Sequence, residues 1–158
     1  MPEEQKKKRV IFICAHNSAR SQIAEAFLNS LFGDKYGAYS AGVEPSRVNP
    51  YAIRAMAEIG IDISDPRAKS VFEFTEIEMD LAVTVCDKAK QSCPFFPAKT
   101  VLHHSFVDPE TFTGSEDEIL EKFRKLRDEI KTWVEQFFSN EEAIDEYRRE
   151  STAILFKK

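Results

Sequence analysis

The stretch that decides the fold is Val10-Ile-Phe-Ile-Cys14-Ala-His-Asn-Ser-Ala-Arg20-Ser21. Its first four residues are apolar, and such a run predicts a strand buried on both faces. After this stretch the apolar period changes to that of a helix with one buried face. The apolar positions of that helix are Ile23, Ala24, Phe27, Leu28 and Leu31. A loop between a strand and a helix directs N–H groups and the positive end of the helix dipole at its contents. The sequence therefore predicts an anion-binding loop that begins with a cysteine.

Cys14 and Arg20 are the two residues of this loop with the clearest chemistry. A helix N-terminus and a nearby cation favour the thiolate, which is the nucleophilic form of cysteine. Arg20 can hold a tetrahedral oxyanion with two parallel N–H donors, which a lysine cannot do. We expect the oxyanion to be bound by Ala15, His16, Asn17, Ser18, Ala19, Arg20 and Ser21. The alternative is an inert cysteine buried at a strand end, but the asparagine and serines beside it favour catalysis.

Composition indicates one globular domain. The 158 residues suffice for a core, and 42% of them are hydrophobic. The net charge of −5 argues against nucleic acid as a partner, and no apolar run has the length of a membrane span. Three cysteines without a secretion signal predict a cytoplasmic protein whose thiols are catalytic or redox-active.

The remaining elements alternate between strand and helix. Further strands are predicted at 36–42, 81–85 and 100–103, and further helices after Asn49-Pro50 and after the capping box at 115–118. This alternation predicts an α/β fold, a single-domain doubly wound parallel sheet of about four strands with helices on both faces. Ligands bind beyond the carboxyl ends of such strands. We therefore expect Cys14, Cys86 and the segment after Leu102 to converge on one site.

The other two cysteines, Cys86 and Cys93, lie seven residues apart. On a helix they would be separated by about 10 Å, whereas a disulfide needs Cβ atoms about 4 Å apart. A bond between them therefore requires the segment to unwind, which suits a switching disulfide better than a structural one. Two inert thiols are one alternative. A zinc site that adds Cys14 and His103 or His104 is another, but it would consume the thiol of the anion site, so no metal is expected.

Asp108 precedes a proline at the same predicted edge of the sheet. A carboxyl group there suits a general acid that protonates a leaving oxygen. Asp-Pro is also a common way to begin a turn. His103 and His104 are candidates for orienting this loop, or are simply part of it.

Residues 14–25 resemble the phosphate-binding loop of the low-molecular-weight protein tyrosine phosphatase superfamily. Several other segments resemble its thioredoxin-coupled arsenate reductase branch. They are 39–42, 48–50, 61–64, the Cys86/Cys93 pair followed by Pro94, 106–109 and 124–130. The resemblance covers residues 9–138, which we expect to form a phosphatase-like arsenate reductase domain. Residues 139–158 predict a C-terminal extension, a helix plus a packing segment.

The resemblance implies a relay of three thiols without a cofactor. Cys14 would attack arsenate while Asp108 protonates the departing oxygen. Cys86 would then attack Cys14 and release arsenite, and Cys93 would form the final disulfide with Cys86. Thioredoxin would reduce that disulfide. Phosphate or sulfate could occupy the same loop, because they share the shape and charge of arsenate.

One position departs from the pattern of that branch. Its members can bind a potassium ion with residues that match Asn17, Glu25, Ser40 and an acidic residue near position 69. This chain has Lys69 there. We expect the lysine ammonium to take the place of the ion beside Glu25, so that activity does not depend on potassium.

Two rival functions stay open at this point. A protein tyrosine phosphatase would use Cys14, Arg20 and Asp108 alone. Phosphatases of this superfamily tend to carry aromatic residues after the Asp-Pro, however, and here Glu110 and Thr111 follow. A non-enzymatic oxyanion or thiol-metal sensor is the second rival. Asp108→Asn separates it, because a sensor needs no general acid.

Overall fold

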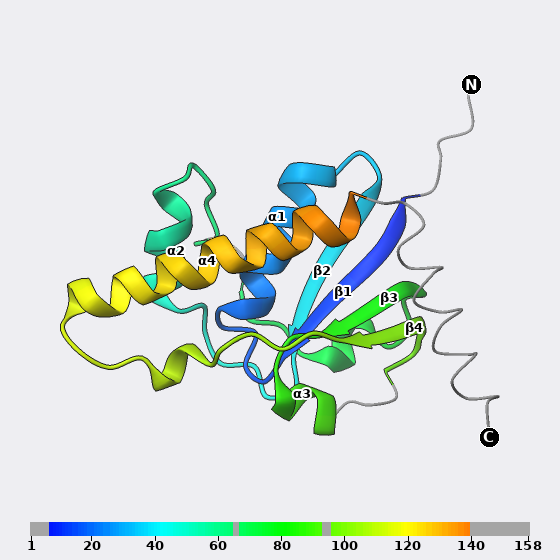
Figure 1. Cartoon of the computed structure of the whole chain (residues 1–158). Coiled ribbons are helices and arrows are strands. Elements are labelled where there is room, and N and C mark those ends of the chain that lie inside the picture. The colour runs from blue at the N-terminus through cyan, green and yellow to red at the C-terminus, as the bar shows by residue number, and fades with distance from the viewer. Residues whose placement is uncertain (1–6, 65–66, 93–95, 140–158) are drawn as a thin grey trace, which may run out of the picture.

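The computed structural model of the chain describes residues 7–64, 67–92 and 96–139. Four parallel strands form one sheet in the order β2-β1-β3-β4 (Figure 1). The strands are β1 Lys8–Cys14, β2 Tyr36–Gly42, β3 Met79–Thr84 and β4 Ala98–His103. The helices are α1 Arg20–Phe32, α2 Pro50–Ala57, α3 Asp87–Ser92 and α4 Glu116–Phe138, with short 3-10 helices η1 Val71–Phe74 and η2 Pro109–Thr111. The predicted α/β class and parallel sheet are confirmed.

The order of the strands determines where a ligand binds. The chain passes from β1 outward to β2, and then crosses back to β3 on the other side of β1. In open parallel sheets this reversal leaves a crevice beyond the carboxyl ends of the central strands. Cys14 is the last residue of β1, and Cys86 follows β3 by two residues. Both thiols therefore lie at the reversal point.

The strands are buried on both faces, as the apolar run at 10–13 predicts. Phe12 packs edge-on against Trp133 and Phe138 of α4, with ring centroids 6.3 and 6.1 Å apart. Helices α1 and α4 therefore share the face to which Phe12 points. Tyr39 of β2 points to the opposite face, where its ring lies 5.8 Å from that of Phe74 in η1.

Polar caps mark the helix starts that the sequence predicts. The side chain of Asn49 accepts N–H groups of the first turn of α2, and Ser115 and Glu118 form a reciprocal capping box at α4. One expectation for α1 is wrong. Leu31 is 39% exposed, and Phe32 packs against the core in its place. At about 100° per residue Leu31 still falls on the face of Ala24, Phe27 and Leu28, so its exposure reflects its place in the last turn of α1 and not a change of period.

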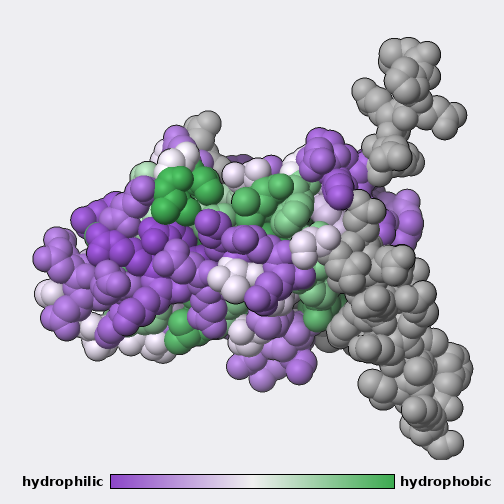
Figure 2. All heavy atoms as spheres, turned by 45° about the horizontal axis from the view of Figure 1, so that its top comes forward, coloured by the Kyte–Doolittle hydropathy of each residue, from purple (hydrophilic) through white to green (hydrophobic). Residues whose placement is uncertain are grey.

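The outer surface of α4 is charged, because its apolar side chains turn inward. Its buried apolar side chains are Leu120, Phe123, Leu126, Ile130, Val134 and Phe138. In Figure 2 a belt of hydrophilic residues crosses the face where α4 lies, with hydrophobic areas beside it. Within the described ranges, no helix has the length and apolar character to cross a membrane. Only Ser139 of the predicted extension at 139–158 is described; the rest lies outside these ranges.

Candidate active site

The loop between β1 and α1, residues 15–19, is held from its outer side by the segment 43–49. Four of its carbonyl groups, counting that of Cys14, accept backbone N–H groups of that segment. The pairs are Cys14 with Val43 (3.1 Å), Ala15 with Glu44 (2.8 Å), His16 with Ser46 (3.1 Å) and Ser18 with Asn49 (2.8 Å). In the described part of the chain, the N–H groups of Ala15, His16, Ser18 and Ala19 have no acceptor. These four donors remain available to an anion.

The start of α1 is also left open to a ligand. Ala19 stands at the N-cap position, where its side chain makes no capping hydrogen bond. Ser, Thr, Asp and Asn are strongly preferred at this position, because their side chains accept the first N–H groups of the helix. An alanine leaves these donors and the positive end of the dipole directed into the loop.

Gly42 is required by how closely the loop approaches β2. A Cβ atom at this position would lie 2.7 Å from the backbone nitrogen of Asn17 and 2.8 Å from the carbonyl carbon of His16. Real Cβ atoms do not come this close to backbone. Any larger residue at 42 would therefore push the anion loop out of place.

Cys14 has two hydrogen-bonding neighbours at its sulfur. The Asn17 backbone N–H donates to Sγ at 3.2 Å, and the hydroxyl of Ser21 lies 2.9 Å from it. The Asn17 side chain donates its Nδ2–H to Ser21 Oγ at 2.8 Å, which leaves the Ser21 proton free to point at the sulfur. Cys14 is only 3% exposed, and these two contacts hold its sulfur in place at the start of the loop.

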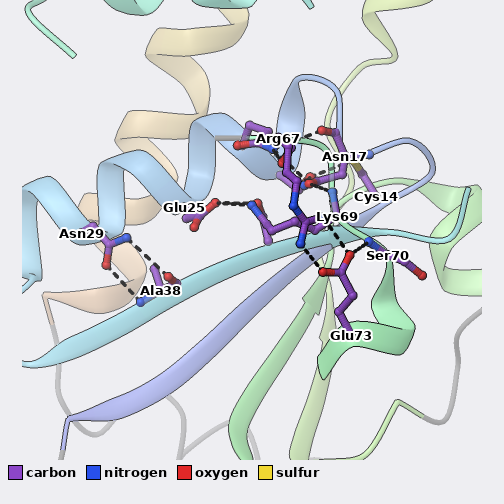
Figure 3. A network of polar contacts seen from close by, with 12 residues as sticks. Cys14, Asn17, Glu25, Asn29, Ala38, Arg67, Lys69, Ser70 and Glu73 are labelled. Atoms are coloured by element: carbon purple, nitrogen blue, oxygen red, sulfur yellow. Dashed lines mark hydrogen bonds and ion pairs between the residues drawn. The ribbon is translucent and has the colours of Figure 1, made fainter. Parts of the chain in front are cut away.

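Asn17 lies behind the loop and connects it to the rest of the fold (Figure 3). It is fully buried and has a φ of 52°, a left-handed conformation that asparagine tolerates. Its Oδ1 accepts from Gln22 Nε2 at 2.9 Å and from the Lys69 N–H at 2.8 Å. Asn17 thus supports the Cys14 thiol from the buried side of the loop and does not line the pocket.

The segment 67–70 forms the second support of the loop. Gln22 Nε2 donates to the Arg67 carbonyl at 3.2 Å, and the Gly42 N–H donates to the Lys69 carbonyl at 2.7 Å. Glu73 anchors the segment from outside by pairing with Arg67 and with the Ser70 N–H. The hydrogen bond from Arg67 is the main reason that the pKa of Glu73 falls to about 2.

Lys69 also contributes its ammonium to this network. Its Nζ lies 3.6 Å from Glu25 Oε1 (Figure 3). Ser40 donates to the same oxygen at 2.5 Å. Burial raises the pKa of Glu25, and the contacts with Ser40 and Lys69 oppose that rise. With an ammonium already beside the carboxylate, these residues do not fit a potassium ion. Whether activity is independent of potassium stays a prediction.

Arg20 and Asp108 meet above the loop. Arg20 is the first residue of α1, and its Nη1 donates to the Phe106 carbonyl at 3.2 Å. Its Nη2 lies 3.8 Å from Asp108 Oδ1, which also accepts the Glu110 N–H at 2.9 Å. The Arg20 side chain is only 11% exposed, whereas that of Asp108 is 47% exposed. Asp108 is therefore accessible to a substrate, and Arg20 is held in place beside it.

These groups line one pocket of about 560 Å³. Its lining includes the predicted residues Cys14, Ala15, His16, Ser18, Ala19, Arg20, Cys86 and Asp108. Cys14 and Cys86 are both free thiols, and each is 3% exposed. Asn17 and Ser21 are not among the lining residues. Cys93 lies outside the described residues.

Sequence reasoning missed several residues that line or support this pocket. The additional lining residues are Asn49, Asp87, Lys88, Ser105, Phe106, Val107, Pro109 and Glu110. Most of them adjoin Cys86 or Asp108 in sequence, and this adjacency was an available signal. Gln22 was missed as a brace, although a glutamine within an apolar helix face is itself unusual. Within the described ranges, no group of three or more His, Cys, Asp or Glu side chains could hold a metal ion.

Comparison with known proteins agrees with this geometry. Residues 9–150 match the family model described as low molecular weight phosphotyrosine protein phosphatase. "Arsenate reductase 1" of Staphylococcus epidermidis is 43% identical over 132 residues, which are 83% of this chain and 96% of that protein. "Arsenate reductase" of Halalkalibacterium halodurans is 41% identical over 132 residues, 83% of this chain and 95% of that protein.

Solved structures show the same similarity. A structure titled "An arsenate reductase in the phosphate binding state" superposes with a TM-score of 0.70 at 32% identity. The superposition covers 84% of this chain and 97% of that one. The chain therefore belongs to the low molecular weight phosphotyrosine protein phosphatase family, and within it to the same group as the members named arsenate reductase.

Proposed function

We propose that this protein reduces arsenate to arsenite by a relay through Cys14, Cys86 and Cys93, with thioredoxin as the final reductant. The observation that carries the proposal is that two free thiols, Cys14 and Cys86, line one oxyanion pocket with Arg20 and Asp108. A phosphatase needs only the first thiol. A reductase needs a second thiol that can reach the first.

In the first step the Cys14 thiolate attacks arsenic. The free N–H groups of the loop and the Arg20 guanidinium stabilise the charge on the arsenate oxygens. Asp108 gives its proton to the leaving oxygen, which departs as water. The product is arsenate bonded through arsenic to the Cys14 sulfur.

In the second step Cys86 attacks the sulfur of Cys14. The sulfur–arsenic bond breaks and its electron pair goes to arsenic, which leaves as arsenite, while a Cys14–Cys86 disulfide forms. Cys93 then attacks Cys86 and frees Cys14 as a thiol, so the remaining disulfide joins Cys86 and Cys93. An external dithiol supplies the two electrons and two protons that close the cycle.

The lining of the pocket favours a small oxyanion over an aryl phosphate. Among the described lining residues Phe106 is the single Phe, Tyr or Trp, and it is only 4% exposed. The position after Pro109 holds Glu110. A phenolic ring would therefore find little aromatic surface to stack on.

The decisive test is arsenate-dependent oxidation of NADPH in the presence of thioredoxin and thioredoxin reductase. The wild type should turn over continuously, and Cys93→Ser should stop after a single turnover. If neither protein turns over while both hydrolyse an aryl phosphate at similar rates, the chain is a phosphatase. The family match gives that second candidate its support.

Asp108→Asn distinguishes both enzymes from a simple oxyanion sensor. The amide cannot donate a proton to the leaving oxygen, so turnover should fall by about 10²- to 10⁴-fold. Phosphate binding, measured by calorimetry, should persist because the loop and Arg20 are unchanged. Full activity in this variant would remove Asp108 from the mechanism.

A further inference from the structure

A chain of three side chains connects the start of α3 to the sheet, outside the oxyanion loop. His103, the last residue of β4, has its Nδ1 2.8 Å from the buried hydroxyl of Thr84. Its Nε2 lies 3.1 Å from Oδ1 of Asp87. Asp87 is the first residue of α3 and directly follows Cys86. The mechanism proposed above uses none of these three side chains.

The donor and acceptor roles in this chain follow from Asp87. A carboxylate can only accept, so Nε2 of His103 carries a proton. In the neutral ring Nδ1 then accepts the Thr84 hydroxyl proton. In the charged ring Nδ1 donates instead, and Thr84 can turn its proton to the Leu102 carbonyl at 3.5 Å. Because every group is satisfied in either state, Thr84 keeps the ring aimed at Asp87.

Helix α3 has few other contacts that hold it. Among residues 87–91 only Ala89 is buried. Lys88 forms an ion pair with Glu44 at 3.6 Å, but both side chains are at least half exposed. The Ala89 N–H donates to Cys86 Sγ at 3.4 Å, so the sulfur that reacts also caps the first turn. The contact of Asp87 with His103 is a second hold on the first turn of α3, and it does not involve that sulfur.

The six residues of α3 occupy every position between Cys86 and Cys93. Along such a helix the rise from Cys86 to Ser92 is about 9 Å, whereas a disulfide needs Cβ atoms about 4 Å apart. The helix must therefore open before the two cysteines can bond. The contact between Asp87 and His103 belongs to the closed helix.

We propose that Thr84, His103 and Asp87 form a latch that keeps α3 helical while Cys86 and Cys93 are both thiols. His103 is then a positioning residue that sets how readily the second disulfide forms. This inference rests on the proposed relay. In the relay Cys93 attacks Cys86 of the Cys14–Cys86 disulfide, so the Cys86–Cys93 bond forms while the Cys14–Cys86 bond breaks and Cys14 leaves as a thiol. When Cys86 and Cys93 are both thiols, their oxidation releases two protons and two electrons, which oxidised dithiothreitol accepts in the titration described below. Since the latch stabilises the dithiol form, its loss should favour the disulfide.

The test is a redox titration of the full chain carrying Cys14→Ser, in which Cys86 and Cys93 are the remaining thiols. Oxidised and reduced dithiothreitol set the potential. Adding His103→Ala should shift the equilibrium two- to fivefold toward the disulfide, the range of a partly exposed ion pair. At 29.6 mV per tenfold this makes the midpoint about 10 to 20 mV more negative. Lys90→Ala, an exposed change on the same helix, should leave the midpoint unchanged.

Asp87 allows the latch to be separated from a helix-dipole effect. Asp87→Asn removes the charge but keeps an oxygen that accepts from His103, so its shift should be smaller than that of Asp87→Ala. The double variant with His103→Ala and Asp87→Ala should shift no further than the larger single variant. His103→Gln, which can still donate to Asp87, should restore much of the wild-type midpoint.

Three outcomes would overturn the inference. An unchanged midpoint in His103→Ala removes the latch. Equal shifts in Asp87→Ala and Asp87→Asn would show that the carboxylate acts only on the helix dipole. If Cys86 and Cys93 form no disulfide at any potential, the proposed relay fails and the latch fails with it. A control shows that the substitution leaves the protein folded. The single variant His103→Ala, which keeps Cys14, should hydrolyse an aryl phosphate at the wild-type rate.

Discussion

The two thiols of the pocket stand in regions of opposite character. Cys14 ends a buried strand and enters a loop whose carbonyl groups are bonded to the segment 43–49 and whose base is held by Asn17. Cys86 leads into α3, a six-residue helix with exposed charged side chains and one buried alanine. Both cysteines are 3% exposed, so exposure does not explain the difference.

The difference shows how one site can combine two kinds of chemistry. Stabilising an oxyanion requires donors that do not move during the reaction, and the braced loop supplies them. Passing a disulfide from one cysteine pair to another requires a segment that opens at low cost, and a short exposed helix meets that need. The rigid region thus serves substrate binding, and the loosely held region serves thiol exchange.

The largest expected effect separates the two thiols. Cys14→Ser should lower both arsenate reduction and aryl phosphate hydrolysis by about a thousandfold or more, because it removes the nucleophile of both reactions. Cys86→Ser should abolish arsenate reduction and leave aryl phosphate hydrolysis within a few-fold of wild type. Both rates are measured on the same purified proteins. Loss of both activities in Cys86→Ser would mean that the two regions are not separate.

A smaller effect is expected on stability, at the brace of the loop. Asn17→Ala removes buried hydrogen bonds and places alanine, which tolerates the left-handed region less well than asparagine, at a φ of 52°, so the free energy of unfolding should fall by about 1–3 kcal/mol. Asn17→Gly tolerates that φ and should be less destabilised than the alanine variant. Gln91→Ala on α3 should stay within about 0.5 kcal/mol of wild type. Urea unfolding measures all three, and equal losses in the two regions would contradict the comparison.

A still smaller effect lies away from both regions, at the end of α2. Glu58 accepts hydrogen bonds from Arg124 and Arg127 of α4, and mainly the contact with Arg124 lowers its pKa from 4.5 to about 2. A lowered carboxyl pKa contributes stability above pH 4.5 that is lost as the pH falls toward 2. Glu58→Gln should therefore show a smaller loss of stability over this range. Urea unfolding curves measured at a series of pH values test this. If the stability of Glu58→Gln falls with pH as much as that of the wild type, Glu58 does not have this role.

The smallest expected effect is that of potassium. Because the Lys69 ammonium already lies 3.6 Å from Glu25, replacing sodium with potassium at constant ionic strength should leave the arsenate reductase rate unchanged. Lys69→Met removes that cation. It should slow the reaction, because Lys69 also contacts Asn17, the residue that braces the loop. A clear rise in wild-type activity with added potassium would show that the lysine does not replace the ion.

Much of the fold could be predicted from the chain because its signals are local. The apolar run at 10–13, the cap at Asn49 and the capping box at Ser115 each act over a few residues. The alternation of these elements implies a parallel sheet, and parallel strands bring their carboxyl ends together. The family resemblance of the Cys14 loop is confirmed by the family match. The roles assigned to Cys93 and to thioredoxin stay predictions.

The errors and omissions arise where contacts are long-range. Periodicity placed Leu31 in the core, but Leu31 is exposed and the partly buried Phe32 packs against the core instead. The loop stretch alone did not distinguish the residues that line the pocket from Asn17 and Ser21, which support it from behind. Those roles depend on which side of the loop the neighbouring segments approach.

The sequence by itself thus determined the order of elements, the parallel sheet and the thiols at its edge. Only the tertiary structure decided that Lys69 donates to Asn17 across 52 positions, and that His103 reaches back 16 positions to Asp87. Strand and helix signals arise from interactions between near neighbours in the chain, which a sequence displays directly. Contacts between distant residues depend on how the finished layers pack, and the sequence does not display that packing.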